Sequence, residues 1–256
     1  LTKEQFNISD KAIHTVIQNY TREAGVRGLE RKIGTLCRKA AVEAAKDSEV
    51  KIRISNRNIK KFLGNYKYTL DAVSDKPQVG IVRGLAWTSV GGDTLEIEVN
   101  VMKGKGALQL TGKLGDVMQE SAKIALSYVK SQLTDVVADD FFEKHDIHLH
   151  VPEGAVPKDG PSAGITMATA MYSACTGKKV KADAAMTGEI TLRGRILPIG
   201  GLKEKILAAK AVGVKLVFVP EKNRKDVEEF DSEVTECVDI RFVTEAPEVW
   251  KLVLEE

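Results

Sequence analysis

The chain has few of the residues that mark several common protein classes. Its three cysteines, Cys37, Cys175 and Cys237, lie far apart and form no C-x-x-C pair. That spacing argues against a disulfide framework or a zinc ribbon, and it is typical of a reducing compartment. No apolar run approaches the ~18 residues that a membrane-spanning helix needs, so no membrane association is expected. The formal net charge of +2 is too small to indicate nucleic-acid binding by itself.

The first residues carry no start signal. Leu1-Thr2-Lys3 is neither an initiator methionine nor the beginning of a signal peptide, so we expect the sequence to begin inside a longer protein. A hydrophobic content of 43% and a charged content of 29% are typical of a globular protein. The 256 residues are enough for one large domain or two small ones.

Histidine is also scarce, and this constrains one motif. The segment 160–164 matches G-x-S-x-G, the nucleophile elbow of α/β-hydrolases, which requires the order serine, acid, histidine. None of the four histidines follows Ser162, so that order is excluded. A triad with the histidine first, through His148 or His150, stays open.

The same two histidines raise the question of a metal. His148 and His150 stand at i and i+2 of a predicted strand and therefore face the same side. Such a pair binds zinc only if further ligands join it, and no third ligand at a familiar spacing is present. We expect no metal, and instead a pair of side chains that shape a nearby site sterically or by hydrogen bonds.

The most informative stretch is 157–164, Pro-Lys-Asp-Gly-Pro-Ser-Ala-Gly. It lies between a predicted strand at 145–152 and a predicted apolar helix at 165–176. A strand, a glycine-rich turn and a helix present one side chain at a helix start, here Ser162. The free amides of that first turn, near Gly160 and Ala163, would face an anion forming at the serine, as in an oxyanion hole. The alternative is a tight turn with an incidental serine.

Asp159 precedes this helix, where a carboxylate is electrostatically favoured. It is either a simple helix-start residue or a neighbour of a catalytic base.

Further along, Gly200-Gly201 opens another predicted helix after a hairpin-like run at 190–199. At ~100° per residue, Lys205 falls within the apolar face of that helix. Burial would lower its pKa and suit it to act as a base, unless the side chain extends to water.

Three blocks make the sequence recognisable: Pro157–Gly164, Met186–Gly194 and Gly200–Lys205. Together they resemble the C-terminal part of Lon, the ATP-dependent serine protease, and the match extends through essentially the whole chain. The resemblance implies that Ser162 is the nucleophile and Lys205 its base. It associates Thr187, in the middle block, with the placement of the lysine.

The resemblance also implies a domain organisation. Residues 1–68 would be the helical lid of an AAA+ module, 69–78 a linker, and 79–256 the proteolytic domain, giving an α+β fold in which a small helical domain precedes a mixed α/β domain. Gly25–Arg31 looks like a sensor-2 segment, in which Arg27 would reach toward nucleotide phosphates. The nucleotide-binding core itself is absent from the sequence. We therefore expect no cofactor in this fragment, and ATP with Mg²⁺ in the full-length protein.

The implied activity is peptide-bond hydrolysis in unfolded or misfolded polypeptides, by a homohexameric ring in the bacterial cytoplasm, with the mitochondrial matrix as the less favoured location. Trp87 would line a substrate groove in the manner of the family, although a core or edge aromatic is the preferred interpretation. The rival is a catalytically silent assembly or nucleic-acid-binding module. The basic residues of the first segment favour a solvated helix face over a nucleic-acid patch.

Periodicity predicts the remaining elements. In the first segment we expect a helix from Ser9–Asp10 to about Gly25, a second at 28–46, a strand at 51–54 and a helix at 56–63. In the second we expect strands near 79–88, 95–101 and 107–111, the last two paired as a hairpin. A helix at 115–137 follows, with an apolar stripe formed by Val117, Ala125, Tyr128-Val129 and Leu133. The chain then ends in the strands 215–219 and 238–243 and the helices 221–230 and 246–254. Gly106–Lys113 is rejected as a phosphate loop because its spacing is wrong and Leu114 replaces the required Ser or Thr.

Overall fold

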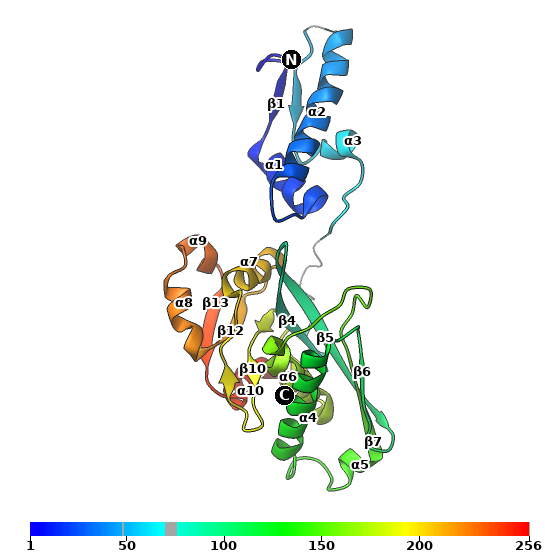
Figure 1. Cartoon of the computed structure of the whole chain (residues 1–256), viewed down its shortest axis with the longest axis vertical. Helices are drawn as coiled ribbons and strands as arrows, with labels where there is room; N and C mark the ends of the chain where they lie inside the picture. Colours follow the sequence, from blue (N-terminus) through cyan, green and yellow to red (C-terminus); the bar gives the residue numbers. More distant parts are fainter. Residues whose placement is uncertain (48, 70–75, 256) are drawn as a thin grey trace. The chain divides into compact units, whose positions relative to one another are not determined.

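The computed structural model describes residues 1–47, 49–69 and 76–255 (Figure 1). The chain divides into two compact units, the first formed mainly by residues 1–71 and the second by most of the remainder. The mixed helix-and-sheet class predicted from the sequence is confirmed. Most of the predicted linker lies outside the described residues, and the boundaries at 68 and 79 stay a prediction.

The first unit packs its helices around a small parallel sheet. Strand β1 pairs in parallel with β2, and the two lie far apart in the sequence. Ser9 begins the first helix as predicted, because its hydroxyl accepts the Ala12 amide at 3.3 Å. The elements are β1 (Phe6–Ile8), α1 (Asp10–Val16), the π-helix η1 (Ile17–Thr21), α2 (Arg27–Lys46), β2 (Ile52–Ile54) and α3 (Ile59–Leu63).

Two expectations for this unit need correction. The first helix does not reach Gly25: it passes into the π-turn and ends where Arg22 takes a left-handed φ of 44°. Strand β1 was not predicted, because three residues are too few to show an alternating pattern. Its register is set by the partner strand β2, whose Ile54 belongs to the buried cluster of the unit (Ala12, Val16, Tyr20, Leu36, Ile54 and Ile59).

The second unit is built on a seven-stranded mixed sheet in the order β13-β12-β9-β4-β5-β7-β6 (Figure 1). Alternate residues of its central strands face two different hydrophobic clusters, so helices α4 and α6 cover one face and α7 covers the other. The sheet strands are β4 (Ile81–Thr88), β5 (Gly91–Lys103), β6 (Leu108–Thr111), β7 (His145–His150), β9 (Ala184–Met186), β12 (Leu216–Pro220) and β13 (Asp239–Val243). The three covering helices are α4 (Asp116–Gln132), α6 (Gly164–Thr176) and α7 (Leu202–Val212).

Shorter elements complete the unit. The three-stranded sheet β14-β8-β3 joins Leu254–Glu255, Lys179–Val180 and Gln78–Val79, and β10 (Glu189–Ile190) forms a hairpin with β11 (Ile196–Leu197). That hairpin confirms the run predicted at 190–199. The remaining helices are α5 (Phe141–Lys144), the 3-10 turns η2 (Pro161–Ala163) and η3 (Glu221–Asn223), α8 (Arg224–Glu228), α9 (Ser232–Thr235) and α10 (Ala246–Val253).

The predicted hairpin between 95–101 and 107–111 is wrong. Strand β7 lies between β5 and β6, antiparallel to the first and parallel to the second. β7 is thus an interior strand of the sheet, and its side chains Ile147 and Leu149 are buried. The Asp146 carboxylate also accepts the amides of Lys105 and Ala107 at 2.7 and 2.9 Å, which ties the connecting loop to the start of β7.

Helix α4 also differs from its prediction. It ends at Gln132 rather than near residue 137, and Val117, assigned to its apolar stripe, is exposed while the neighbouring Met118 is buried. The stripe was therefore placed one residue out of phase at its start.

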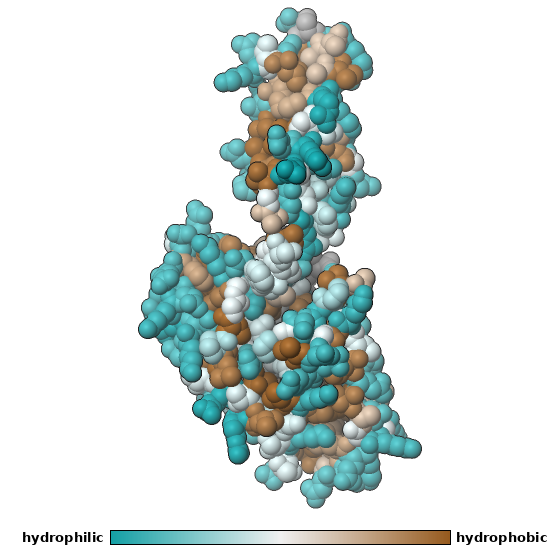
Figure 2. Space-filling model, viewed as in Figure 1, coloured by the Kyte–Doolittle hydropathy of each residue, from teal (hydrophilic) through white to brown (hydrophobic). Residues whose placement is uncertain are grey.

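None of the described helices combines the length and apolarity needed to cross a bilayer. Figure 2 shows mostly hydrophilic residues over α8 and α9. Asp231, between these two helices in the sequence, forms an exposed ion pair with Lys203 of α7.

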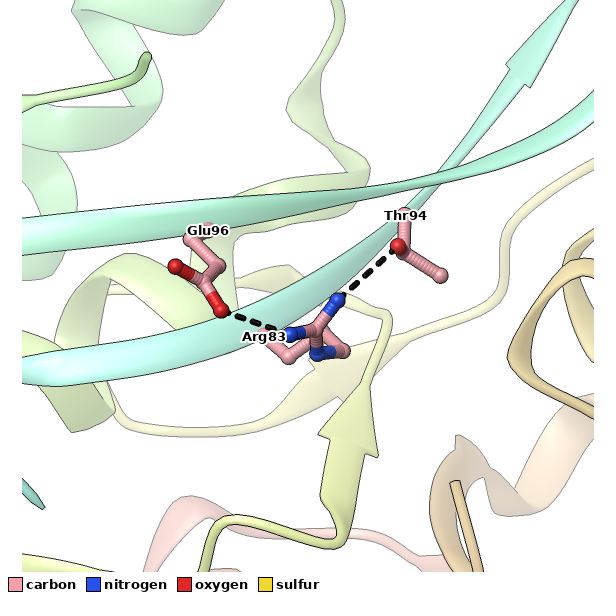
Figure 3. A network of polar contacts seen from close by, with 3 residues as sticks. All are labelled: Arg83, Thr94 and Glu96. Carbon is pink, nitrogen blue, oxygen red and sulfur yellow. Dashed lines mark hydrogen bonds and ion pairs between the residues drawn. The ribbon is translucent and has the colours of Figure 1, made fainter. Parts of the chain in front are cut away.

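One charged side chain is buried within the sheet itself. Arg83 on β4 is only 7% exposed, and its guanidinium donates to Glu96 at 2.6 Å and to Thr94 at 3.1 Å (Figure 3). Both partners belong to the adjacent strand β5, so the arginine bridges two strands by side-chain contacts. A buried cation with a carboxylate and a hydroxyl as acceptors is a satisfied group.

Candidate active site

Ser162 stands at the start of a buried helix. It lies in the 3-10 turn η2, which continues directly into α6, and its side chain is half-buried. Gly160 before it has φ 116°, a conformation that glycine adopts without strain. Most of α6 is buried, so the helix is fixed against the sheet and the serine is held on a rigid support. The predicted strand, turn and helix are therefore present.

The amides around Ser162 divide into committed and free groups. The Gly160 amide donates to the side chain of Asp159 at 2.9 Å, and the Ile165 amide donates to the Gly188 carbonyl at 3.1 Å. Within the described part of the chain, the Ser162 amide donates to no acceptor, whereas the Ala163 and Gly164 amides take part in the 3-10 turn η2. A free N–H group at the positive end of a helix is suited to an oxyanion.

Asp159 does not face the lysine but another helix. Its carboxylate accepts the Met118 amide, in the first turn of α4, at 2.9 Å. A Cβ at Gly115 would lie 2.4 Å from the carboxyl carbon, so only glycine leaves room for this contact. No contact among the described residues joins Asp159 to Lys205. Its carboxylate anchors the serine turn to the start of α4.

Lys205 projects from the second turn of α7 into the apolar layer beneath that helix. It is 2% exposed and lies beside the buried residues Leu202 and Ile206. This burial lowers the pKa of Lys205 from 10.5 to about 8, because desolvation disfavours the ammonium. No carboxylate among the described residues pairs with it. The prediction of a lysine aimed into apolar surroundings is borne out by its burial.

Thr187 connects the lysine to the serine. It follows the last residue of β9, is 1% exposed, and its amide donates to the Phe218 carbonyl of β12 at 3.2 Å. Its hydroxyl accepts from Lys205 Nζ at 3.1 Å and donates to the Ser162 carbonyl at 3.3 Å. The Gly188 amide donates to the same carbonyl at 2.8 Å. The strand end therefore holds both the lysine amine and the backbone of the serine.

The proton count at Thr187 has a chemical consequence. A hydroxyl has one proton, and here the Ser162 carbonyl receives it, so Thr187 can only accept from the lysine. A neutral lysine amine that donates one proton to Thr187 keeps its lone pair free. That lone pair is the feature that a base needs.

The serine hydroxyl and the lysine amine are not joined directly. No hydrogen bond between described residues links the Ser162 hydroxyl to Lys205 Nζ, and the connection between the two residues passes through Thr187. Such bonds are often long or absent in a ligand-free site and form with the substrate. The geometry brings the two residues to one hydroxyl but does not itself show a serine–lysine pair.

The two strand histidines lie elsewhere. The Thr111 hydroxyl contacts His148 Nε2 at 2.9 Å and His150 Nδ1 at 2.7 Å, so both rings are held by the neighbouring strand β6. No described contact joins either ring to Ser162. The described residues also contain no group of three or more His, Cys, Asp or Glu side chains arranged to hold a metal ion.

Trp87 is an exposed aromatic rather than a core residue. It is 62% exposed at the end of β4, so of the preferred interpretation, a core or edge aromatic, the core alternative is wrong and the edge alternative stays open. Its ring lies over Gly201, where an added Cβ would meet it at 2.8 Å. Gly201 is the N-cap of α7, so the indole contacts the start of the lysine helix. No local pattern indicates this contact, because it joins segments more than a hundred residues apart.

Arg27 belongs to the first unit and begins helix α2, where it is exposed. The first turn of that helix is closed by Glu23, whose carboxylate accepts the amides of Gly28 and Leu29 at 2.7 and 2.8 Å. Arg27 itself remains accessible to a ligand. Its sensor-2 role stays a prediction.

Comparison with known proteins gives the family. Residues 53–256 match the Lon protease (S16) C-terminal proteolytic domain. The chain belongs to the Lon protease family. Residues 1–53 match the Lon protease AAA+ ATPase lid domain. The resemblance drawn from the three sequence blocks is confirmed.

Similar proteins include Lon proteases of several bacteria. The Lon protease of Lachnoclostridium phytofermentans is 52% identical over 99% of this chain and 36% of its own length. That of Finegoldia magna is 52% identical over 99% of this chain and 33% of its length, and Lon protease 1 of Bacillus subtilis is 53% identical over 92% and 31%. The chain therefore spans about a third of the length of these relatives.

Proposed function

We propose that this chain is the lid and proteolytic part of an ATP-dependent serine protease, with Ser162 as nucleophile and Lys205 as base. The observation that supports it best is the lysine itself. Lys205 is buried without a carboxylate partner in the described part of the chain, has its pKa lowered to about 8, and donates to the same hydroxyl that holds the serine backbone. A structural lysine gains nothing from that arrangement, whereas a base requires it.

The chemistry follows from these groups. The Ser162 hydroxyl attacks the carbonyl carbon of a peptide bond while its proton passes to the neutral amine of Lys205. The negative charge that forms on the carbonyl oxygen is received by backbone amides of the serine turn, among them the free amide of Ser162. The Lys205 ammonium then gives its proton to the leaving amine, and a water activated by the same lysine hydrolyses the ester at Ser162.

The proposal extends to the whole protein. Its substrates are unfolded or misfolded polypeptides, its assembly is a homohexamer, and it works in the bacterial cytoplasm. ATP and Mg²⁺ act on the full-length protein, where the exposed guanidinium of Arg27 would contact a phosphate. The described residues offer no phosphate loop, since Gly106–Lys113 includes strand β6, so this chain alone is expected to cleave only short or unstructured peptides.

A covalent label and a peptidase assay test the proposal. An unstructured fluorogenic peptide should be cleaved by the wild type, and a fluorophosphonate should modify Ser162. Ser162→Ala should lose both signals. Ser127→Ala is the matched control, because Ser127 is an exposed serine on α4 whose hydroxyl donates only to Lys123, and it should keep both.

The rival functions predict other results. A silent assembly or nucleic-acid-binding module gives neither label nor turnover in the wild type. An esterase that uses His148 or His150 loses essentially all turnover in the double alanine variant. Either result would refute the Ser162–Lys205 assignment.

A further inference from the structure

Asn223 is a buried polar residue that the proposed chemistry does not use. It ends the turn η3 and is 3% exposed. Its side-chain carbonyl accepts the Ile199 amide at 3.0 Å, and its amide nitrogen donates to the Ile199 carbonyl at 2.9 Å. The second amide proton goes to Asp226 at 2.6 Å. The side chain thus pairs with both backbone groups of one residue, and Asp226 fixes which way its amide points.

The residue that Asn223 holds lies at a weak point of the chain. Ile199 is followed by Gly200 and Gly201, and then directly by helix α7. Two consecutive glycines have more accessible backbone conformations than any other pair, and Gly201 takes a left-handed φ of 65°. The direction in which α7 leaves this segment is therefore set by the contacts on either side of it.

Those contacts tie the lysine helix to the strand that holds Thr187. Asn223 lies three residues beyond the end of β12, and β12 pairs with β9 and accepts the Thr187 amide at Phe218. Lys205 stands one turn into α7, where its own amide donates to the Gly201 carbonyl at 3.1 Å. One strand therefore holds Thr187 at its middle residue, Phe218, and leads into Asn223, which holds the start of the helix that brings Lys205 to Thr187.

We infer that Asn223 is a positioning residue of the active site, which fixes the entry of α7 and so keeps Lys205 buried against Thr187. This inference rests on the proposed function, since it assigns a role within the same site. Without the two hydrogen bonds from Asn223 to Ile199, the two glycines let the start of α7 move. Lys205 then gains water and loses its alignment with the Thr187 hydroxyl.

The signature of such a role is a change in how the site titrates. When Lys205 becomes more hydrated, its pKa rises from about 8 toward its ordinary value. A rise of one unit in the pKa of Lys205 would lower the fraction of neutral Lys205 at pH 7 about tenfold. The acidic limb of kcat should shift upward by about one unit, and KM should stay unchanged.

The experiment compares kcat against pH for the wild type and for Asn223→Ala on an unstructured peptide, with the thermal midpoint of each protein measured in parallel. Ser173→Ala is the matched control. Ser173 is fully buried, and its hydroxyl also bonds two backbone groups, the Gly80 amide at 2.9 Å and the Lys178 carbonyl. It lies near the C-terminal end of α6, whereas Ser162 precedes the N-terminal end of that helix. It should lower the thermal midpoint comparably and leave the acidic limb in place.

Two further variants sharpen the test. Gly200→Ala adds a methyl group in open space and restricts the hinge, so in the Asn223→Ala background it should return the limb part of the way. Asp226→Ala removes only the exposed acceptor that orients the Asn223 amide and should give a smaller shift in the same direction. Asp226→Ala decides the matter if Asn223→Ala does not fold.

The outcomes separate the two claims. An unshifted limb in folded Asn223→Ala, or in Asp226→Ala where only that variant folds, overturns the positioning role, as does an equal shift in Ser173→Ala. If substitution of Lys205 in the otherwise wild-type chain leaves turnover unchanged, the proposed function is overturned, and the positioning role is overturned with it. The inference is supported if the acidic limb of kcat moves upward in Asn223→Ala and Asp226→Ala and returns part of the way when Gly200→Ala is added to Asn223→Ala.

Discussion

The second unit buries two cations, and their surroundings are opposite. Arg83, 7% exposed, lies between two strands with a carboxylate at 2.6 Å and a hydroxyl at 3.1 Å (Figure 3). Lys205, 2% exposed, lies under a helix with one hydroxyl at 3.1 Å and no carboxylate partner among the residues that the structure describes. Arg83 comes from an apolar stretch of sequence, whereas Lys205 follows the charged residues Lys203 and Glu204 and is buried because it lies on the inner face of its helix.

The difference concerns what each group can do chemically. A guanidinium keeps its proton at any working pH, so its burial has to be compensated by an acceptor of opposite charge. An amine without a counter-charge responds by releasing its proton more easily, which burial here brings within reach of neutral pH. The paired cation therefore stabilises structure, whereas the unpaired one is available for proton transfer.

The sharpest way to test this contrast is to remove the lysine. Lys205→Met should abolish turnover, a loss of about 10³-fold or more, since a positioned base contributes that much. Lys205→Arg should be inactive too, because a guanidinium does not accept the proton. Peptidase assays on purified variants measure both. A Lys205→Arg variant that retains activity would show that another group is the base.

The same substitution should raise stability. The lowered pKa means that the folded state holds fewer protons than the unfolded state between about pH 8 and 10.5, so the unfolding free energy of the wild type rises across that window. Below it the buried ammonium costs up to ~3 kcal/mol. Urea titrations should therefore find Lys205→Met more stable than the wild type at pH 7, with a smaller difference at pH 10.

The next largest effect is expected at the hydroxyl that the lysine contacts. Thr187→Val keeps the shape of the side chain but removes the acceptor for Lys205 and the donor to the Ser162 carbonyl. Turnover should fall roughly 10- to 100-fold as the base loses its alignment. Stability should fall only by ~1 kcal/mol per lost neutral hydrogen bond. Full activity in this variant would remove Thr187 from the mechanism.

Local chemistry explains which parts of the site were predictable. The serine turn was foreseen because Gly160 permits a positive φ and Pro161 fits the first turn of a helix, and the burial of Lys205 because helical periodicity places it on the apolar face. Both signals lie within ten residues of the side chain they concern. They therefore survive whatever the rest of the fold does.

The contacts that complete the site were not foreseeable. Asp159 was expected to serve its own helix or the lysine, but it closes the first turn of α4. Trp87 lies over Gly201, and Asn223 holds Ile199. Each joins distant segments through strand order, and the order was itself mispredicted where β7 enters between β5 and β6. Register between distant strands is decided by burial over the whole sheet, which no local window contains.

The pH dependence of turnover gives a smaller effect that separates lysine from histidine. If Lys205 is the base, kcat should rise about tenfold per pH unit below about 8 and level off above it. A histidine base would place the same limb near ~6.5. A variant with both His148→Ala and His150→Ala should keep the wild-type profile, because both rings contact Thr111 rather than the serine. Loss of the limb in that variant would transfer the base role to a histidine.

Changes at the other buried cation, Arg83, should leave turnover unaltered. Glu96→Ala would leave the buried guanidinium of Arg83 with Thr94 as its remaining side-chain acceptor, and should lower the unfolding free energy by ~1–2 kcal/mol. The lower figure applies if solvent already screens the pair, since the glutamate side chain is 39% exposed. Arg83→Met removes the charge and keeps much of the buried stem, so it should cost less than breaking the pair. Urea unfolding of both single variants and the double variant gives the coupling between them. All three should cleave peptide at the wild-type rate, and a loss of turnover in Glu96→Ala would show that the paired cation also supports the site.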